Sequence, residues 1–313
     1  MNKIKKVLLQ LCNFITSKEK MEFSLQDIKE FTKMHIKEKN KIEGELKFSI
    51  IMPSYNQIEF IERSILSVLN QDYTNYELII IDGGSTDGTV DIIKKYEDYL
   101  AYWITEKDKG QSHALNKGFE KATGDIYAWL NSDDLLLPHA LKYQHDEYKK
   151  NKQAKIVFGD YYNIDKDDNI ENKVYSFDFN LNHFVYEGFH LNSQAMSWCK
   201  DVHECFGIFD EDLHRTMDYD MIARFGAKEG DKAFKRISIP LACFRQHDAQ
   251  KTTGMDNTVI SEHMKIAKKI NFDDKYSSLG KIFRLKYRFR RFFWYTKRKG
   301  LNYSIKMILK SLK

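Results

Sequence analysis

The stretch Ile126-Tyr127-Ala128-Trp129-Leu130-Asn131-Ser132-Asp133-Asp134 is typical of a buried β-strand that ends in two adjacent carboxylates. A second apolar run, Glu77-Leu78-Ile79-Ile80-Ile81, leads into Asp82 and the glycine-rich turn Gly83-Gly84-Ser85-Thr86-Asp87-Gly88. Acids at the carboxyl ends of two strands of one α/β sheet can converge on a single ligand crevice. Oxygen ligands of this kind suit Mg²⁺ or Mn²⁺ carrying a diphosphate.

Strand-like and helix-like segments alternate from residue 48 onwards. We expect strands over 48–52, 76–81, 100–105, 125–130, 155–159 and 237–244, and helices over 58–69, 86–96, 111–122, 138–149 and 217–224. This alternation predicts an α/β fold with crossover helices and a mostly parallel sheet. The apolar strand runs indicate burial on both faces. Between residues 161 and 192 the pattern loosens, and Asp165-Lys166-Asp167-Asp168-Asn169 predicts a polar hairpin turn.

The two ends of the chain differ from this α/β body. Residues 1–47 are rich in Lys and Glu, with a helical pattern from Ile4 to Ile15 and a helix start at Ser24. Residues 280–313 hold twelve Lys or Arg and no Asp or Glu, so the rest of the chain carries 5 − 12 = −7. We expect three parts: a helical N-terminal extension (1–47), an α/β domain (48–254) and a basic, aromatic helical region (255–313).

Length and composition limit the class of protein. A chain of 313 residues with 42% hydrophobic and 14% aromatic residues can bury a real core, which excludes global disorder. No apolar run approaches the ~18 residues of a membrane-spanning helix, and the N-terminal segment lacks the cleavage site of a signal peptide. The cysteines form no C-x-x-C pair, which favours reduced thiols and a cytosolic location; they are Cys12, Cys199, Cys205 and Cys243.

Six motifs occur in an order that resembles a known family. They are Ser49-Ile50-Ile51-Met52-Pro53-Ser54-Tyr55-Asn56, Ile80-Ile81-Asp82-Gly83-Gly84-Ser85-Thr86-Asp87-Gly88-Thr89, Asp108-Lys109-Gly110-Gln111-Ser112-His113-Ala114-Leu115-Asn116-Lys117-Gly118, Asn131-Ser132-Asp133-Asp134, Met217-Asp218-Tyr219-Asp220 and Arg245-Gln246-His247. Residues 48 to about 251 therefore resemble a family 2 glycosyltransferase with a GT-A fold, similar to bacterial enzymes of polysaccharide assembly. The resemblance implies inverting, metal-dependent transfer of a sugar from a nucleotide-sugar, expected to be a UDP-sugar. The expected acceptor is a saccharide, lipid-linked, in cell-surface polysaccharide biosynthesis.

The resemblance also implies which residues bind the nucleotide-sugar donor. Asp82 would accept from a uracil N–H, although an acid here can instead bond the amides of its own glycine turn. Tyr55 would stack on the base, or belong to the core. Asp108 and Asn116 would lie near a helix start that suits phosphate, or serve packing. The expected donor-binding residues are Pro53, Ser54, Tyr55, Asp82, Asp108, Asn116, Asp133, His247 and Lys251.

The adjacent acids Asp133 and Asp134 are the metal candidates, because neighbouring carboxylates repel unless a cation relieves them. By resemblance Asp134 would bind Mn²⁺ or Mg²⁺ and Asp133 would serve the metal or the ribose, with His247 reaching the metal or the diphosphate. The alternative is a solvated acidic turn. The family's acidic tripeptide often begins with Asp where this chain has Asn131 or Ser132, so we expect weak metal binding.

Inverting transfer needs a base that removes the proton of the acceptor hydroxyl. Asp218 matches the family's base position, while the acid that often precedes it is replaced by Met217. Asp220 lies two residues further on, on another face of a helix, so the two acids should not share one role. The alternative for Asp218 is a helix N-cap.

The basic tail interleaves aromatic with cationic residues over 280–313. A basic, aromatic amphipathic helix suits an anionic membrane surface, so we expect a protein peripheral to the inner face of the cell membrane. Packing of the aromatic residues on the body is the alternative, and nucleic acid is not an expected partner because no RNA-binding motif accompanies the tail.

Two other functions remain open from the sequence. A sugar-1-phosphate nucleotidyltransferase would need a glycine-rich loop after the first strand, and Met52-Pro53-Ser54-Tyr55-Asn56 has no glycine. An inactive sugar-nucleotide-binding scaffold would not be expected to keep the acids at positions 82, 133, 134 and 218.

Overall fold

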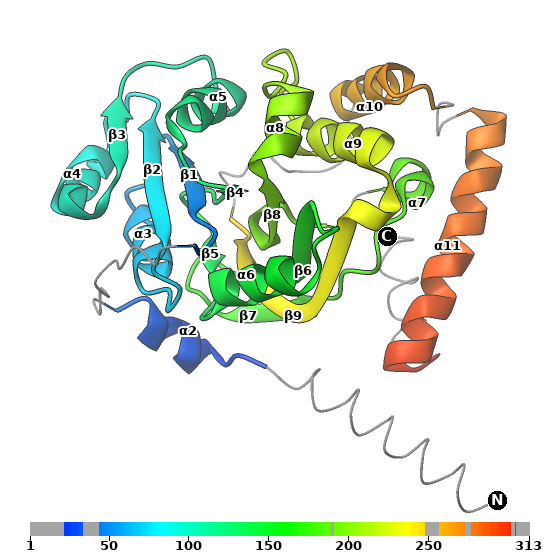
Figure 1. The fold of residues 1–313 in the computed structure, drawn as a ribbon, viewed down its shortest axis with the longest axis horizontal. Coiled ribbons are helices and arrows are strands. Elements are labelled where there is room, and N and C mark those ends of the chain that lie inside the picture. Colours follow the sequence, from blue (N-terminus) through cyan, green and yellow to red (C-terminus); the bar gives the residue numbers. More distant parts are fainter. Residues whose placement is uncertain are drawn as a thin grey trace, which may run out of the picture.

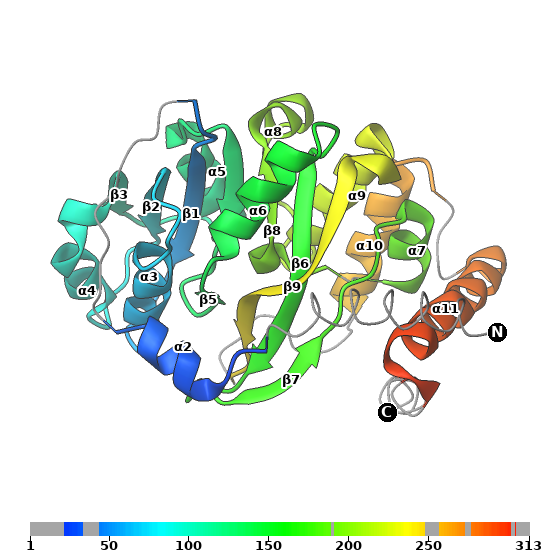
Figure 2. The same cartoon turned by 60° about the horizontal axis from the view of Figure 1, so that its bottom comes forward.

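The computed structural model describes residues 22–33, 44–188, 191–247, 257–272, 277–301 and 304. Within them, nine strands form one sheet in the order β3-β2-β1-β4-β8-β6-β9-β5, with β7 paired to β6. Figures 1 and 2 show this sheet with helices on both faces. The strands are β1 (Phe48–Ser54), β2 (Tyr76–Asp82), β3 (Tyr102–Thr105), β4 (Ile126–Trp129), β5 (Leu135–Leu136), β6 (Ile156–Ile164), β7 (Ile170–Val174), β8 (Met196–Cys199) and β9 (Phe234–Arg245).

The N-terminal half of the sheet is parallel, as predicted. β1 pairs with β2 and β4, and β2 pairs with β3, all in parallel. The register aligns Ser54 with Asp82, so the first two strands end at the same edge. The predicted α/β class is therefore confirmed.

The other half of the sheet is mixed, which the sequence did not predict. β8 runs antiparallel to both β4 and β6, and β7 and β5 pair antiparallel to β6 and β9. Only the pairing of β6 with β9 is parallel among the described strands of this half. β8 was missed because it is short and lies directly after the stretch in which the pattern loosens.

The helices pack on the faces of the sheet and also lie beyond its two ends (Figure 1). They are α2 (Leu25–Phe31), α3 (Ile61–Leu69), α4 (Thr89–Lys95), α5 (Gln111–Lys121), α6 (Ala140–Lys150), α7 (Leu181–Glu187), α8 (Lys200–Phe206), α9 (Met217–Glu229), α10 (Asn257–Lys269) and α11 (Ser278–Lys299). The predicted helix start at Ser24 is confirmed, because Ser24 and Asp27 form a capping box on α2. The helical pattern predicted for residues 4–15 lies outside the described residues.

Both faces of the sheet are buried, which accounts for the continuous apolar runs. Ile50 and Met52 of β1 join the core cluster on one face, and Ile51 joins the cluster on the other, as the two-residue period of a strand requires. Every residue of β1 and β2 is buried.

Helix α5 lies unusually close to the sheet because of Gly118. A Cβ atom at Gly118 would stand 2.3 Å from Cγ2 of Ile51, a separation that real side chains do not reach. The close seating aims the first turn of α5 at the carboxyl ends of the parallel strands.

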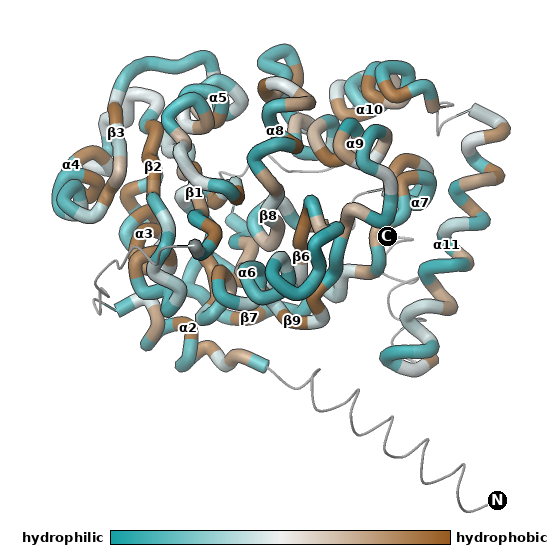
Figure 3. The backbone as a smooth tube through the Cα atoms, in the orientation of Figure 1, coloured by the Kyte–Doolittle hydropathy of each residue, from teal (hydrophilic) through white to brown (hydrophobic). Residues whose placement is uncertain are grey.

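Helix α11 stands at one end of the molecule, beside α7 and opposite α4, in both views (Figures 1 and 2). Its colouring alternates between hydrophilic and hydrophobic segments (Figure 3). No helix in the part of the chain that the structure describes is both long and apolar enough to cross a membrane.

Candidate functional site

A cavity of about 520 Å³ opens where the parallel strands β1, β2 and β4 end. This is the edge at which ligands bind in open α/β sheets. Its walls come from the end of β1, the turn after β2, the first turn of α5, the turn after β4 and the end of β9. The lining residues are Pro53, Ser54, Tyr55, Gln57, Gly83, Lys107, Asp108, Gly110, Gln111, Ala114, Asn131, Ser132, Asp133 and Phe244.

Five of the residues predicted to bind the donor line this cavity: Pro53, Ser54, Tyr55, Asp108 and Asp133. Tyr55 is 61% exposed, so it is not a core tyrosine and its ring is free to stack on a base. The Ser54 hydroxyl is buried and has no hydrogen-bond partner among the described residues. A buried hydroxyl normally has a partner, so its position favours a ligand in the cavity.

Asp82 lies behind the cavity wall and is fully buried. One of its oxygens accepts from the backbone N–H groups of Gly84 and Ser85 and from the Thr105 hydroxyl, at 3.1, 2.9 and 2.6 Å. The other accepts from the Ser85 hydroxyl at 2.5 Å. The structure therefore shows the turn-bonding alternative, and contact of Asp82 with a base stays a prediction.

Asp108 and Asn116 have different surroundings although both belong to one motif. Asp108 accepts from Gly110 N–H at 2.8 Å and lies against Gly83, where a Cβ would approach it to 2.7 Å. Asn116 is buried; its amide donates to the carbonyl of Phe209 at 3.0 Å and accepts from its N–H at 2.8 Å. Asn116 thus supports the loop that leads to α9, which is the packing alternative, and its contact with a donor stays a prediction.

Asp133 and His247 meet at the edge of the cavity. His247 Nε2 lies 3.0 Å from Asp133 Oδ2, and the imidazole packs on the Phe60 ring with centroids 4.8 Å apart. The structure thus brings together two of the three predicted metal-binding residues.

Asp134 points the other way. Its side chain is fully buried, and its oxygens accept from Arg245 N–H at 2.8 Å and from the Asn131 amide at 3.1 Å. Burial, with Asp133 nearby, raises the pKa of Asp134 well above its ordinary value, while Arg245 opposes that rise. Asp134 is therefore placed to shape the turn after β4, and Asp133 is placed to meet a ligand.

Both the oxygen and the nitrogen of the Asn131 side-chain amide have hydrogen-bond partners. Its oxygen accepts from Gln111 at 2.7 Å and from the Trp129 indole at 2.6 Å, while its nitrogen donates to Asp134. Its backbone N–H donates to Gln194 at 2.5 Å. An ionised aspartate could not donate to Asp134, so the asparagine is suited to holding that carboxylate in place.

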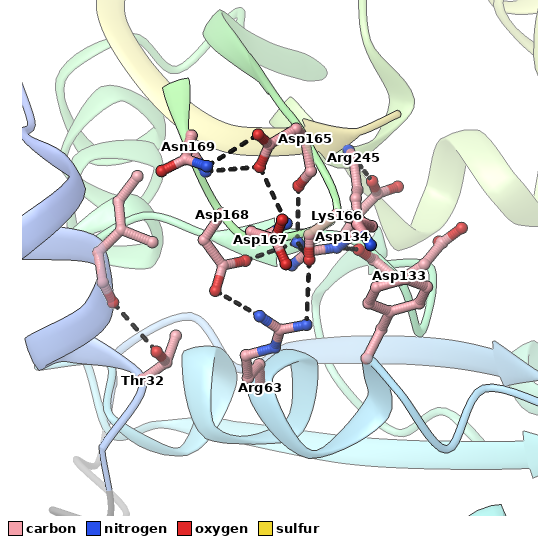
Figure 4. Close-up of polar contacts among 12 residues, drawn as sticks. Thr32, Arg63, Asp133, Asp134, Asp165, Lys166, Asp167, Asp168, Asn169 and Arg245 are labelled. Atoms are coloured by element: carbon pink, nitrogen blue, oxygen red, sulfur yellow. Dashed lines mark hydrogen bonds and ion pairs between the residues drawn. The ribbon is translucent and has the colours of Figure 1, made fainter. Parts of the chain in front are cut away.

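Arg245 anchors the turn that carries both acids (Figure 4). Its guanidinium is fully buried and donates through Nε to the Asp133 carbonyl at 2.7 Å. It also lies 4.9 Å above the centre of the Phe60 ring, on which His247 packs. One side chain therefore supports both Asp133 and His247.

The hairpin turn between β6 and β7 supplies the counter-charge. One oxygen of Asp168 forms an ion pair with Arg245 Nη1 at 2.6 Å. Its other oxygen pairs with Nη1 of Arg63, on α3, also at 2.6 Å. Asp168 has a φ of +69°, a left-handed conformation that Asp and Asn tolerate better than most residues. The antiparallel pairing of β6 with β7 confirms the predicted polar hairpin. Asp168 is the buried residue of its turn, whereas Lys166, Asp167 and Asn169 are exposed.

Asp218 lies in the first turn of α9 and is partly exposed. Its carboxylate accepts from Tyr219 N–H at 2.8 Å, and burial raises its pKa to about 6. The preceding Met217 accepts from the Ser112 hydroxyl of α5 at 2.9 Å, which ties Asp218 to the helix that lines the cavity. Asp220 is fully buried and paired with Arg224 at 2.7 Å, so the two acids do have separate surroundings, as expected.

The donor set can be tested against a divalent cation. No group of three His, Cys, Asp or Glu side chains converges within the described ranges. Asp133 and His247 offer one carboxylate and one imidazole, a pair that suits Mn²⁺ if a diphosphate and water complete the coordination. Asp133 and His247 therefore fit a weakly held metal. Lys251, which we predicted to bind the donor, lies outside the described residues.

Several contributors to the site were not predicted. Gln111 and Gln194 hold Asn131, and Asp168 holds Arg245. Glutamines carry no distinctive signal, whereas an Asp in a polar hairpin next to a buried Arg is recognisable only when the fold is known.

Comparison with known proteins supports the resemblance to family 2 glycosyltransferases. A family model described as Glycosyl transferase family 2 matches residues 49–215. An uncharacterised glycosyltransferase of Rickettsia typhi is 31% identical over 227 residues, covering 68% of this chain and 67% of the relative. Chondroitin synthase of Escherichia coli is 30% identical over 177 residues, covering 55% of this chain and 25% of that protein.

Among solved structures, S. aureus TarS 1–349 in complex with UDP-GlcNAc aligns with a TM-score of 0.59 at 17% identity, covering 81% of this chain and 74% of that chain. At this identity the likeness concerns the fold alone.

Proposed function

The chain belongs to glycosyl transferase family 2, and we propose that it moves a sugar from a UDP-sugar to a saccharide acceptor in polysaccharide biosynthesis, with inversion at the anomeric carbon. The observation that carries the proposal is the cavity at the carboxyl ends of the parallel strands. It is lined by the exposed Tyr55, by Ser54, whose hydroxyl has no partner among the described residues, and by Asp133, which His247 contacts. The matches to glycosyltransferases, including a chondroitin synthase, support it.

The donor would lie with its base near Tyr55 and its diphosphate near Asp133 and His247. Tyr55 offers a π-face, Ser54 a hydroxyl, and the first turn of α5 backbone N–H groups that favour anions. A Mn²⁺ or Mg²⁺ ion held by Asp133 and His247 would neutralise charge on the departing diphosphate. Because the Asn131 amide and the Asp134 carboxylate are hydrogen-bonded to each other, the protein supplies few side chains as metal ligands. This supports a weak affinity for the metal.

Asp218 would remove the proton of the acceptor hydroxyl as that oxygen attacks the anomeric carbon. A pKa of about 6 leaves the carboxylate ionised at neutral pH yet more basic than an ordinary aspartate. The alternative role of N-cap is not supported, because Thr216 occupies the N-cap position of α9 and Asp218 lies within the helix.

We further propose a lipid-linked acceptor and a peripheral position on the inner face of the membrane. One face of α11 exposes large apolar side chains at intervals of three or four residues: Leu279, Ile282, Leu285, Phe289 and Phe293. Exposed Lys281, Lys286, Arg290 and Lys297 flank this outer face, and α11 has no acidic residue. Such a face matches an anionic bilayer surface, where lipid-linked saccharides reside.

Donor turnover tests the proposal. We expect hydrolysis or transfer of a UDP-sugar that requires Mn²⁺ or Mg²⁺ and releases UDP, measured by chromatography of the nucleotide products. Asp133→Asn should lower turnover by roughly two orders of magnitude, because charge stabilisation worth several kcal/mol is lost. Asp91→Asn, an exposed change on α4, is the matched control and should be neutral.

The other candidate functions give different outcomes. A nucleotidyltransferase would form UTP from the UDP-sugar and pyrophosphate, and a scaffold would bind the donor without turnover. Absence of both binding and turnover, for all common nucleotide-sugars with either metal, would refute the proposal.

A further inference from the structure

Helix α10 contributes a buried carboxylate that lies beyond the stretch matched by the family model. Glu262 is 3% exposed, whereas the family match ends at residue 215. A buried glutamate needs several donors to offset the loss of hydration, so its partners show what it holds.

Among the described residues, Glu262 accepts hydrogen bonds from the turn just before α9. One oxygen accepts from His214 N–H at 2.9 Å. The other accepts from Arg215 N–H at 3.3 Å and from the Thr216 hydroxyl at 2.8 Å. Thr216 is the N-cap of α9, and its side chain makes no cap hydrogen bond to the helix. Glu262 thus holds the backbone of residues 214 and 215 and the side chain of the N-cap residue Thr216, directly before the first turn of α9.

Two further contacts join α10 to the same helix turn. The His263 ring packs on Tyr219 with centroids 4.4 Å apart. Lys269 Nζ lies 3.2 Å from the buried carboxylate of Asp220. Helix α10 therefore holds the residues on both sides of Asp218: residues 214–216 before it, and Tyr219 and Asp220 after it.

We propose that Glu262 is a positioning residue that fixes the first turn of α9 and so directs the Asp218 carboxylate toward the acceptor hydroxyl. This inference rests on the proposed role of Asp218 as the base. It makes α10 part of the catalytic unit. It also assigns the effect to the acceptor side of the reaction, because the contacts of Glu262 named above are with residues that do not line the donor cavity.

Glu262→Gln tests the proposal because glutamine keeps the volume but presents an amide NH₂ where a backbone N–H needs an acceptor. We expect kcat to fall about tenfold or more, with KM for the UDP-sugar and the Kd for UDP unchanged. The acid limb of the pH–rate profile should move to lower pH, since a loosened turn is better hydrated and burial is what raises the pKa of Asp218. Lys265→Gln, on the exposed side of α10, is the matched control.

Thr216→Val is the second variant, in case Glu262→Gln does not fold; it deletes only the hydroxyl donor. It should show the same split, with kcat lowered and donor binding retained. A folded Glu262→Gln or Thr216→Val protein with wild-type kcat and an unmoved acid limb would overturn the inference. If instead Asp218→Asn kept full turnover, the base assignment itself would fail, so the two failures can be told apart.

Discussion

At the scale of single residues, the site separates carboxylates by their surroundings. Asp133 and Asp134 are neighbours in the chain, yet Asp133 faces the cavity and His247 while Asp134 is enclosed with Asn131 and Arg245. Burial, with the charge of Asp133 nearby, raises the pKa of the enclosed acid. Adjacent acids can therefore have different tasks without a third acid to complete the motif.

Asp218→Asn should stabilise the fold at neutral pH. Burial raises the pKa of Asp218 to about 6 from an ordinary value of 3.8, so the unfolded chain loses its proton first and stability falls as pH rises through that interval. The substitution removes this penalty, worth up to about 3 kcal/mol at pH 7. Urea unfolding at pH 4 and pH 7 measures the effect: the two proteins should differ at pH 7 and converge near pH 4. Equal stability at pH 7 would contradict the burial argument.

The sequence predicted the acids of the site but not which of them faces the cavity. The direction of Asp134 depends on Arg245, which lies 111 residues away along the chain. A local sequence pattern cannot reveal a contact between residues so far apart along the chain. Asn116 shows the same limit, because its partner Phe209 lies 93 residues away.

At the scale of elements, the β6–β7 hairpin stabilises the site through the ion pairs of Asp168. Asp168 at its tip links Arg63 of α3 with Arg245 of β9, and Arg245 in turn bonds the Asp133 backbone. Three elements distant in sequence are thus joined at one buried carboxylate.

Asp168→Asn should destabilise the protein by about 3–5 kcal/mol, because a fully buried Arg245 loses the carboxylate that neutralises it. Asparagine tolerates the left-handed backbone of this position, so the loss of charge is tested without added strain. Urea denaturation monitored by circular dichroism gives the free energy of unfolding. Asp167→Asn, an exposed change in the same turn, should cost little; a comparably small loss for Asp168→Asn would disprove the support.

Element prediction succeeded where the period was clear. Apart from the two-residue strand β5, the α-helices and strands that begin between residues 48 and 156 were predicted to within about five residues at each end, since long apolar runs alternate there with amphipathic stretches. The antiparallel β8 and the helices around it were missed, because four-residue strands carry almost no periodicity.

At the scale of the whole molecule, α11 has two different faces. Its inner face packs on the body: Tyr287 stacks near His183 and Arg291 pairs with the buried Glu187 at 3.0 Å. Its outer face exposes the apolar residues named above. The alternative that aromatic residues pack on the body is thus true of the inner face, and contact of the outer face with a bilayer stays a proposal.

Leu285, Phe289 and Phe293 changed together to Ser should weaken binding to anionic vesicles by about tenfold or more, since each buried apolar side chain contributes roughly 1.5–3 kcal/mol. Sedimentation with phosphatidylglycerol vesicles measures this, and binding should fall at high salt because the flanking charges are screened. Tyr99 and Ile208 changed to Ser remove exposed apolar groups elsewhere and form the control. Unchanged sedimentation of the α11 variant would refute the membrane contact.

The predicted division of the chain at residues 47 and 254 stays a prediction. The contacts between α10 and α9 cross the second of these boundaries.

Gly118 has a consequence for the width of the donor cavity. The missing side chain lets α5 settle onto β1, and the first turn of that helix carries Gln111, which fixes Asn131. The position of the cavity wall formed by α5 therefore depends on Gly118, a buried residue two turns away that does not line the cavity. A larger residue at this position would have to move α5 away from β1, so the shape of the cavity depends on packing beneath the site as well as on its lining residues.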